Sequence, residues 1–254
     1  MATRDDRLRE LGLWPRWTRR GESVAAAAAS PPGAGVAAAT PAVDVPDGAA
    51  GASREARIAG LGWENLAADV DACTACGLCR TRQRSVPGVG DTAADWLFVG
   101  EAPGAEEDAQ GEPFVGQAGR LLDSMLTALQ IARGRNVYIA NVLKCRPPNN
   151  RTPTPGEVAA CRPYLDRQVA LIAPKIIVAL GKSAANTLLE NEATIGSLRG
   201  RVHAYRGVPL VVTYHPAYLL RTLQDKAKAW EDLVLARRTL QSATVATPVA
   251  GRRP

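Results

Sequence analysis

The sequence lacks the features of membrane-embedded and secreted proteins. No apolar run approaches the ~20 residues that a membrane-spanning helix needs. The first residues include acids but no apolar segment of the kind found in a secretory signal. We therefore expect a soluble cytoplasmic protein, a setting in which disulfides are rare. Its five cysteines then predict either metal ligation or reactive thiols.

Repeat architectures and phosphate-loop nucleotide binding are excluded as well. No internal repeat is visible. The triplet Gly181-Lys182-Ser183 resembles the end of a phosphate-binding loop, but that motif needs a glycine at a position that Ile176 occupies here. Aromatic residues make up only 5% of the chain. Alanine, glycine, proline and arginine are frequent instead, which indicates a GC-rich genome more than a special fold.

Composition divides the chain into four parts. Residues 1–20 form a basic tail with interleaved tryptophan and arginine, and residues 21–55 form a low-complexity linker. Residues 56–241 form one folded domain, followed by a C-terminal tail at 242–254. Residues 1–55 have no net charge and the C-terminal tail has +2, which leaves +4 of the total +6 to the domain. A mildly basic domain fits a polyanionic partner without establishing one.

The domain alternates short apolar runs with helical patterns. Buried strands are predicted at residues 96–99, 137–140, 175–180 and 208–213, and helices at 121–133, 156–172, 183–189 and 226–241. Runs without a polar face are typical of parallel strands covered on both sides. We therefore predict an α/β fold, a three-layer α/β/α sandwich with a four-stranded parallel sheet, preceded by a disordered N-terminal tail.

Polar residues follow three of the predicted strands. Glu101 follows the first, Asn141 ends the second and His215 follows the last. Parallel strands present their carboxyl ends at one edge of the sheet, where ligands of open α/β folds bind. These three side chains should therefore meet in one crevice and form a site. The other histidine, His203, is interpreted as structural.

The cysteines have the spacing of a shared inorganic centre. Cys73 and Cys76 form a C-x2-C pair, and fifteen residues separate Cys145 from Cys161. Four thiolates suit either zinc or an iron-sulfur cluster, and spacing alone leaves both open. The alternative is that they are small core residues. Cys79 has no place in this set of four. It is either a substitute ligand for Cys76 or a buried thiol, and we favour the buried thiol.

Four segments together carry a family resemblance. They are GEAPG at 100–104 with PFVG at 113–116, NVLKCRPP at 141–148, HPAYLLR at 215–221 and the cysteine spacing. In all four, the chain resembles family 4 uracil-DNA glycosylases, the iron-sulfur branch of the uracil-DNA glycosylase superfamily. The resemblance covers residues 63–241 and leaves the first 55 residues unmatched.

The resemblance implies a DNA repair activity. Such an enzyme flips uracil out of DNA, hydrolyses its N-glycosidic bond, releases free uracil and leaves an abasic site. It also implies a four-iron, four-sulfur cluster held by Cys73, Cys76, Cys145 and Cys161, with zinc as the alternative. We expect this cluster to be structural and to shape the loops that face DNA. The implied partner is uracil-containing DNA, the implied setting the nucleoid of a bacterial cytoplasm, and the expected state a monomer.

Recognition roles in the pocket follow from the resemblance. Phe114 would stack on uracil, Asn141 would match its polar edge, and the backbone around Glu101 and Ala102 would contact the base. Cytosine presents the inverse donor and acceptor pattern to Asn141 and would be rejected. Leu219 would enter the space that the flipped base leaves.

The catalytic and phosphate-binding roles are assigned in the same way. His215 would donate a hydrogen bond to uracil O2 as negative charge develops there. Many superfamily members have an aspartate where this chain has Ala102, so Glu101 becomes the candidate for orienting the attacking water and Asp108 a candidate for holding the loop. Phosphate contacts are expected from four arginines: Arg80, Arg82, Arg84 and Arg221.

Two other functions are weighed against this one. One superfamily branch traps uracil-DNA covalently through a histidine in an inserted basic loop. The equivalent residues after Pro148 are Asn149-Asn150-Arg151-Thr152-Pro153, without histidine, which disfavours trapping. The remaining alternative is a non-catalytic iron-sulfur or zinc protein that docks on nucleic acid or on a protein partner through the N-terminal tail.

Overall fold

The computed structural model describes residues 53–245, with side chains described for residues 53–242. The predicted tail at 1–20, nearly all of the linker at 21–55 and nearly all of the tail at 242–254 lie outside the described residues. The described part belongs to one compact unit, residues 50–254.

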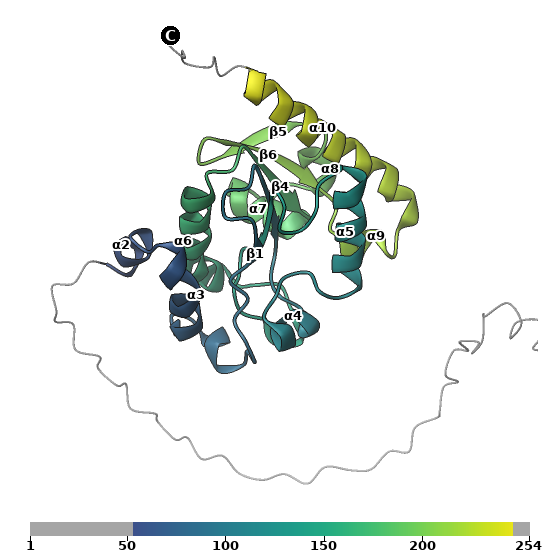
Figure 1. Cartoon of the computed structure of the whole chain (residues 1–254). Helices are drawn as coiled ribbons and strands as arrows, with labels where there is room; N and C mark the ends of the chain where they lie inside the picture. The colour runs from purple at the N-terminus through teal and green to yellow at the C-terminus, as the bar shows by residue number, and fades with distance from the viewer. Residues whose placement is uncertain (1–52, 246–254) are drawn as a thin grey trace, which may run out of the picture. The chain divides into compact units, whose positions relative to one another are not determined.

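One six-stranded sheet, ordered β1-β3-β2-β4-β6-β5, forms the centre of the domain (Figure 1). Its strands are β1 (Val89–Gly90), β2 (Trp96–Gly100), β3 (Val137–Asn141), β4 (Ile176–Leu180), β5 (Val202–Tyr205) and β6 (Val208–Thr213). The four middle strands pair in parallel, as predicted. Every residue of β2, β3 and β4 is buried, which explains why these runs have no polar face.

The predicted number of strands was wrong, because two edge strands join the sheet in antiparallel pairing. β1 is only two residues long, so no periodicity could reveal it. β5 is half exposed and contains His203, as an edge strand allows. The turn from β5 to β6 is the two-residue loop Arg206-Gly207, with φ of 48° and 80°. That loop length and backbone conformation are typical of a tight hairpin.

Helices surround the sheet, and the four predicted ones lie within a few residues of their expected positions. The α-helices are α2 (Arg54–Ala59), α3 (Trp63–Ala72), α4 (Ala105–Gln110), α5 (Gln117–Ala128), α6 (Pro155–Ile172), α7 (Lys182–Leu189), α8 (Ile195–Leu198), α9 (Pro216–Leu219) and α10 (Lys226–Val245). Three 3-10 turns are η1 (Gly77–Arg80), η2 (Pro148–Asn150) and η3 (Leu223–Asp225). α5 ends five residues before the predicted Arg133, and α10 continues four residues past Gln241. None of the described helices has the length and apolarity to cross a bilayer.

Alternation along β2 divides the core into two layers. Leu97 and Val99 face the core that includes residues of α2, α3 and α6, whereas Trp96 and Phe98 face the core that includes residues of α5 and α10. Figure 1 accordingly shows α3 and α6 on one side of the sheet and α5 and α10 on the other. The three-layer α/β/α prediction is therefore confirmed. This arrangement leaves the carboxyl ends of the strands at one rim, where the loops that carry the motifs gather.

Candidate active site and cysteine pocket

The carboxyl ends of β2, β3 and β6 bring together the three polar residues that the sequence singled out. Glu101, Asn141 and His215 all line one pocket of about 520 Å³. Three more predicted site residues, Ala102, Phe114 and Arg221, line the same pocket. Strands β3 and β2 are neighbours in register, with Gly100 opposite Asn141, which explains how residues forty positions apart along the chain share one wall.

Gly100 allows two of these side chains to approach each other. A methyl group added at Gly100 would lie 2.4 Å from Asn141 Oδ1 and 2.6 Å from Phe114 Cζ. Real side-chain carbons do not come so close to other atoms. The glycine at the end of β2 is therefore required by the packing of the asparagine amide and the phenyl ring in the same space.

Phe114 is held in a strained backbone conformation. Its φ of 56° lies in the left-handed region that residues other than glycine avoid. Arg133 donates hydrogen bonds from its two terminal nitrogens to the carbonyl oxygens of Pro113 and Phe114, each at 2.8 Å. The Phe114 carbonyl also approaches Gly119 so closely that a methyl group there would lie 1.7 Å from it. These contacts fix the direction of the ring, which is 6% exposed.

The loop after β2 is joined to the Phe114 loop by Glu107. Its carboxylate accepts hydrogen bonds from the backbone amides of Gly104 at 3.0 Å, Val115 at 3.0 Å and Gly116 at 3.3 Å. Asp108, 2% exposed, accepts from the Gln83 amide at 2.9 Å. Both carboxylates therefore fix loops by accepting backbone hydrogen bonds, which is the role expected for Asp108.

His215 presents a neutral imidazole to the pocket. Its Nδ1 accepts a hydrogen bond from the Ala217 amide at 3.1 Å, which assigns the ring proton to Nε2. Burial, opposed by Glu107 and assisted by Arg221, lowers the pKa of His215 to about 4. The ring stacks against Phe114 with 5.6 Å between centroids. The site thus offers a hydrogen-bond donor without a positive charge.

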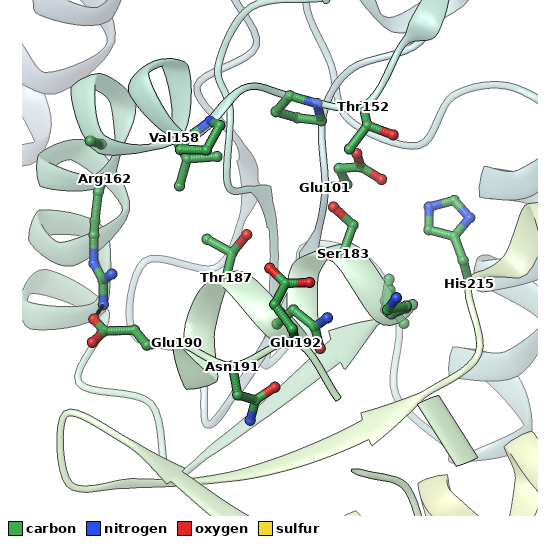
Figure 2. A pocket seen from close by; sticks show the side chains of 17 residues that line it. Glu101, Thr152, Val158, Arg162, Ser183, Thr187, Glu190, Asn191, Glu192 and His215 are labelled. Atoms are coloured by element: carbon green, nitrogen blue, oxygen red, sulfur yellow. Dashed lines mark ion pairs between the residues drawn. The ribbon is translucent and has the colours of Figure 1, made fainter. Parts of the chain in front are cut away.

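Glu101 faces His215 across the crevice. The two residues, with Ser183, also line a second pocket of about 760 Å³, and Figure 2 shows their side chains around its upper end. Burial raises the pKa of Glu101, and a hydrogen bond from Ser183 opposes this shift. Ser183 lies in the first turn of α7, so the triplet that fails as a phosphate loop instead supplies a partner for the carboxylate.

Leu219 is the predicted site residue that the structure places elsewhere. Its side chain is 1% exposed and lines an apolar groove together with Met125 of α5 and Trp230 of α10. In this conformation Leu219 is therefore buried, and its entry into the space of a flipped base stays a prediction. The reason is that α9 is a single turn whose last residue faces α5. The next residue, Leu220, is 41% exposed.

The cysteines gather in a separate pocket, on the side of α3 and α6. All five, namely Cys73, Cys76, Cys79, Cys145 and Cys161, line it together. Three of the sulfur atoms accept hydrogen bonds: from the Arg82 guanidinium to Cys145 at 2.9 Å, from the Lys144 amide to Cys161 at 3.2 Å, and from Arg54 to Cys73 at 3.5 Å. Within residues 53–245, no group of three or more His, Cys, Asp or Glu side chains is arranged to hold a single metal ion.

The chain matches a known protein family and several of its members. The family model for the uracil DNA glycosylase superfamily matches residues 87–234. A type-4 uracil-DNA glycosylase of Archaeoglobus fulgidus is 46% identical over 165 residues, 62% of this chain and 82% of that protein. One of Pyrobaculum aerophilum is 43% identical over 171 residues (64% and 87%), and one of Thermotoga maritima is 45% identical over 161 residues (63% and 83%).

The chain belongs to the type-4 branch of the uracil-DNA glycosylase superfamily. The residues that line the crevice fall between positions 101 and 221, so the superfamily match includes all of them, together with Cys145 and Cys161. It begins at Pro87, after the other three cysteines. The C-x2-C segment is therefore outside the superfamily match, although it folds against residues within it.

Sequence reasoning missed the residues that support the site. Glu107, Arg133, Lys144 and Ser183 contact the predicted site residues or their loops. One signal was available for Glu107, because an acid three residues after the N-cap of a helix is typical of a capping box. The contacts of the other three depend on the tertiary fold and leave no local pattern.

Proposed function

We propose that this protein is a DNA repair glycosylase that removes uracil, the product of cytosine deamination, by hydrolysing its N-glycosidic bond. The observation that carries the proposal is the convergence of Glu101, Asn141 and His215 on one pocket. The names of the type-4 relatives support the same activity. The products are free uracil and an abasic site.

Base recognition requires an extruded nucleotide. Flipping a base out of a duplex costs a few kcal/mol, and the pocket of about 520 Å³ accommodates one pyrimidine with part of its sugar. Phe114 stacks on the ring from its fixed position. The Asn141 amide accepts from uracil N3–H and donates to O4, whereas cytosine presents the inverse pattern and leaves both groups unpaired.

Bond cleavage develops opposite charges on the two fragments. The electron pair of the C1′–N1 bond moves to uracil, whose O2 becomes negative, and the sugar becomes an oxocarbenium-like cation. His215 donates its Nε2–H to O2, a role that requires the neutral tautomer fixed by the Ala217 amide. A donor whose pKa is about 4 stays neutral at physiological pH and need not lose a proton to act.

Water completes the reaction by adding to C1′. Ala102 cannot activate it, so we assign the orientation of the water to Glu101, held by Ser183. The oxygen of water bonds to C1′ and its proton leaves through Glu101, while the uracil anion is protonated on release. Arg221, exposed at the pocket edge, and the exposed Arg80 and Arg84 contact phosphates.

The fold changes two of the candidate DNA contacts. Arg82 binds Cys145 and the Asp71 carbonyl, so we remove it from the phosphate contacts. Leu220, exposed beside Arg221, replaces Leu219 as the side chain proposed to fill the space of the flipped base.

We further propose that Cys73, Cys76, Cys145 and Cys161 hold a four-iron, four-sulfur cluster. The donor set fits, because five thiols line one pocket and cationic or amide donors reach three of the sulfurs. Zinc needs four ligands around one ion, whereas in a four-iron, four-sulfur cluster each thiolate would bond its own iron. When bound, the cluster supplies a structural crosslink between the N-terminal segment and the β3 loop.

The decisive assay measures free uracil. The full-length chain is incubated with an oligonucleotide that contains one uracil, and with a matched oligonucleotide that contains thymine. We expect uracil release from the first only, with alkali-labile abasic DNA and no protein-DNA adduct on a denaturing gel. Absence of uracil release from protein that contains about four iron atoms per chain would reject the function. Colourless active protein with stoichiometric zinc would reject the cluster alone.

A further inference from the structure

Lys144 is a buried ammonium group between the two pockets. Its side chain is 1% exposed. Nζ donates hydrogen bonds to the Asn141 carbonyl at 2.8 Å and to Gln168 Oε1 at 2.6 Å, both of them neutral acceptors. None of the ion pairs found within residues 53–242 involves Lys144. A buried charge without a compensating charge is strongly unfavourable, so its counter-charge must lie elsewhere.

The groups that can supply this counter-charge are sulfur atoms. Lys144 lines the cysteine pocket, and its backbone amide donates to Cys161 Sγ at 3.2 Å. Cys145 is its neighbour in the chain and lines the same pocket. Thiolates that hold a cluster carry negative charge. With a cluster bound, the ammonium would therefore lie near an anionic centre on one side, while on the other side it contacts the peptide of Asn141, which lines the uracil pocket.

On the other side, Lys144 fixes the peptide of Asn141. Asn141 is the last residue of β3, and the chain turns immediately afterwards, with the Val142 amide bonded to the Gly100 carbonyl at 2.9 Å. The hydrogen bond from Nζ fixes the orientation of the Asn141 carbonyl at this turn. The amide side chain starts from the same Cα and is tightly packed over Gly100, so a small rotation of this peptide would move the amide within the pocket.

Gln168 connects the arrangement to the helix that carries Cys161. Both residues lie on α6, two turns apart on one face. Gln168 Nε2 donates to the Pro87 carbonyl at 2.7 Å and to the Tyr138 hydroxyl at 3.3 Å. These bonds direct its Oε1 to Lys144 and leave no alternative orientation of the amide.

We propose that Lys144 is a positioning residue that couples the cysteine pocket to the reading of uracil by Asn141. This inference rests on the proposed function. Without the lysine, Asn141 remains in place along β3 but its amide loses the fixed orientation that distinguishes uracil from cytosine. General affinity for DNA does not change.

The test is a double-mutant cycle on binding rather than on turnover. The probe is an oligonucleotide with one 2′-fluoro-2′-deoxyuridine, which resists cleavage, and its reference is the same oligonucleotide with 2′-fluoro-2′-deoxycytidine, whose polar edge has the inverse donor and acceptor pattern. Fluorescence anisotropy gives both affinities for wild type, Lys144→Met, Asn141→Ala and the double variant. Lys144→Met should reduce the preference for the uracil probe about tenfold, the size of a lost hydrogen bond from a charged donor. Within the Asn141→Ala background it should have no further effect.

A second readout concerns the cluster itself. Removal of a positive charge beside it should shift its reduction potential to a more negative value in Lys144→Met. Lys175→Met is the matched control, because Lys175 is 49% exposed and pairs with Asp95 at the opposite end of the sheet. It should change neither the preference nor the potential.

The outcomes separate this inference from the proposed function. Wild-type protein that releases no uracil rejects the function. Wild-type protein that releases uracil, together with equal losses of preference in both backgrounds or an unshifted potential, overturns the role of Lys144. If Lys144→Met does not fold, Gln168→Leu removes one of the two acceptors of the ammonium and should lower the preference about threefold. Failure of both variants to fold with iron bound would make the lysine a core requirement and would overturn the proposal.

Discussion

Replacement of Gly100 by alanine should damage the pocket without unfolding the domain. The new methyl group would lie 2.4 Å from Asn141 Oδ1 and 2.6 Å from Phe114 Cζ. Ordinary contacts begin at 3.4 Å, so one or both groups must move by about 1 Å. Phe114 cannot yield easily, because Arg133 and Gly119 hold its backbone. Asn141 therefore moves, and a shift of about 1 Å at a reacting site costs roughly a hundredfold in rate.

The assay is single-turnover release of uracil, with thermal unfolding measured on the same preparations. Overpacking of this kind costs about 1–3 kcal/mol of stability, which a folded domain tolerates. Gly156→Ala is the matched control, since nothing lies within 4 Å of a methyl group there and alanine favours a helix by up to about 1 kcal/mol. Gly100→Ala protein that stays folded and cleaves within about threefold of wild type would refute the packing that this account assigns to the pocket.

Three further predictions address individual side chains. An NMR titration of His215 should give a midpoint near its pKa of about 4, so the imidazole stays neutral from alkaline pH down to about 5; a midpoint near 6.5 would contradict its neutral state at physiological pH. Asn141→Asp should lower release of uracil and admit cytosine, and unchanged selectivity would remove its assigned role. Leu219→Ala should lower the free energy of unfolding by about 2–5 kcal/mol, whereas Leu220→Ala should leave the unfolding temperature unchanged and slow excision from duplex DNA; the reverse pattern would restore Leu219 as the inserted residue.

The strands that are buried on both faces were predictable, because burial requires apolar residues along their whole length. The four parallel strands are continuous apolar runs because helices cover both of their faces, and this requirement is visible in the residues themselves. β1 and β5 lie at the edges, where a short or half-exposed strand satisfies no such requirement. Their pairing is set by the neighbouring strand and the hairpin turn, so the number of strands was underestimated.

The part of the site that lies at the ends of the parallel strands was predictable. Glu101, Asn141 and His215 follow parallel strands, so their convergence follows from topology. The direction of Leu219 does not, because one residue of rotation in a single-turn helix exchanges a buried position for an exposed one. The supports from Arg133 and Lys144 depend on long-range contacts between loops and helices that no local pattern encodes.

The most direct measurement of the central claim compares chemistry with binding in His215→Ala. The single-turnover rate of uracil release and the affinity for the 2′-fluoro-2′-deoxyuridine oligonucleotide are measured on the same iron-loaded protein. The rate should fall about a hundredfold to a thousandfold, with affinity for the oligonucleotide nearly unchanged. A variant that releases uracil at the wild-type rate, or that loses binding and rate in equal proportion, would contradict the assignment of His215 as the donor that stabilises the departing base.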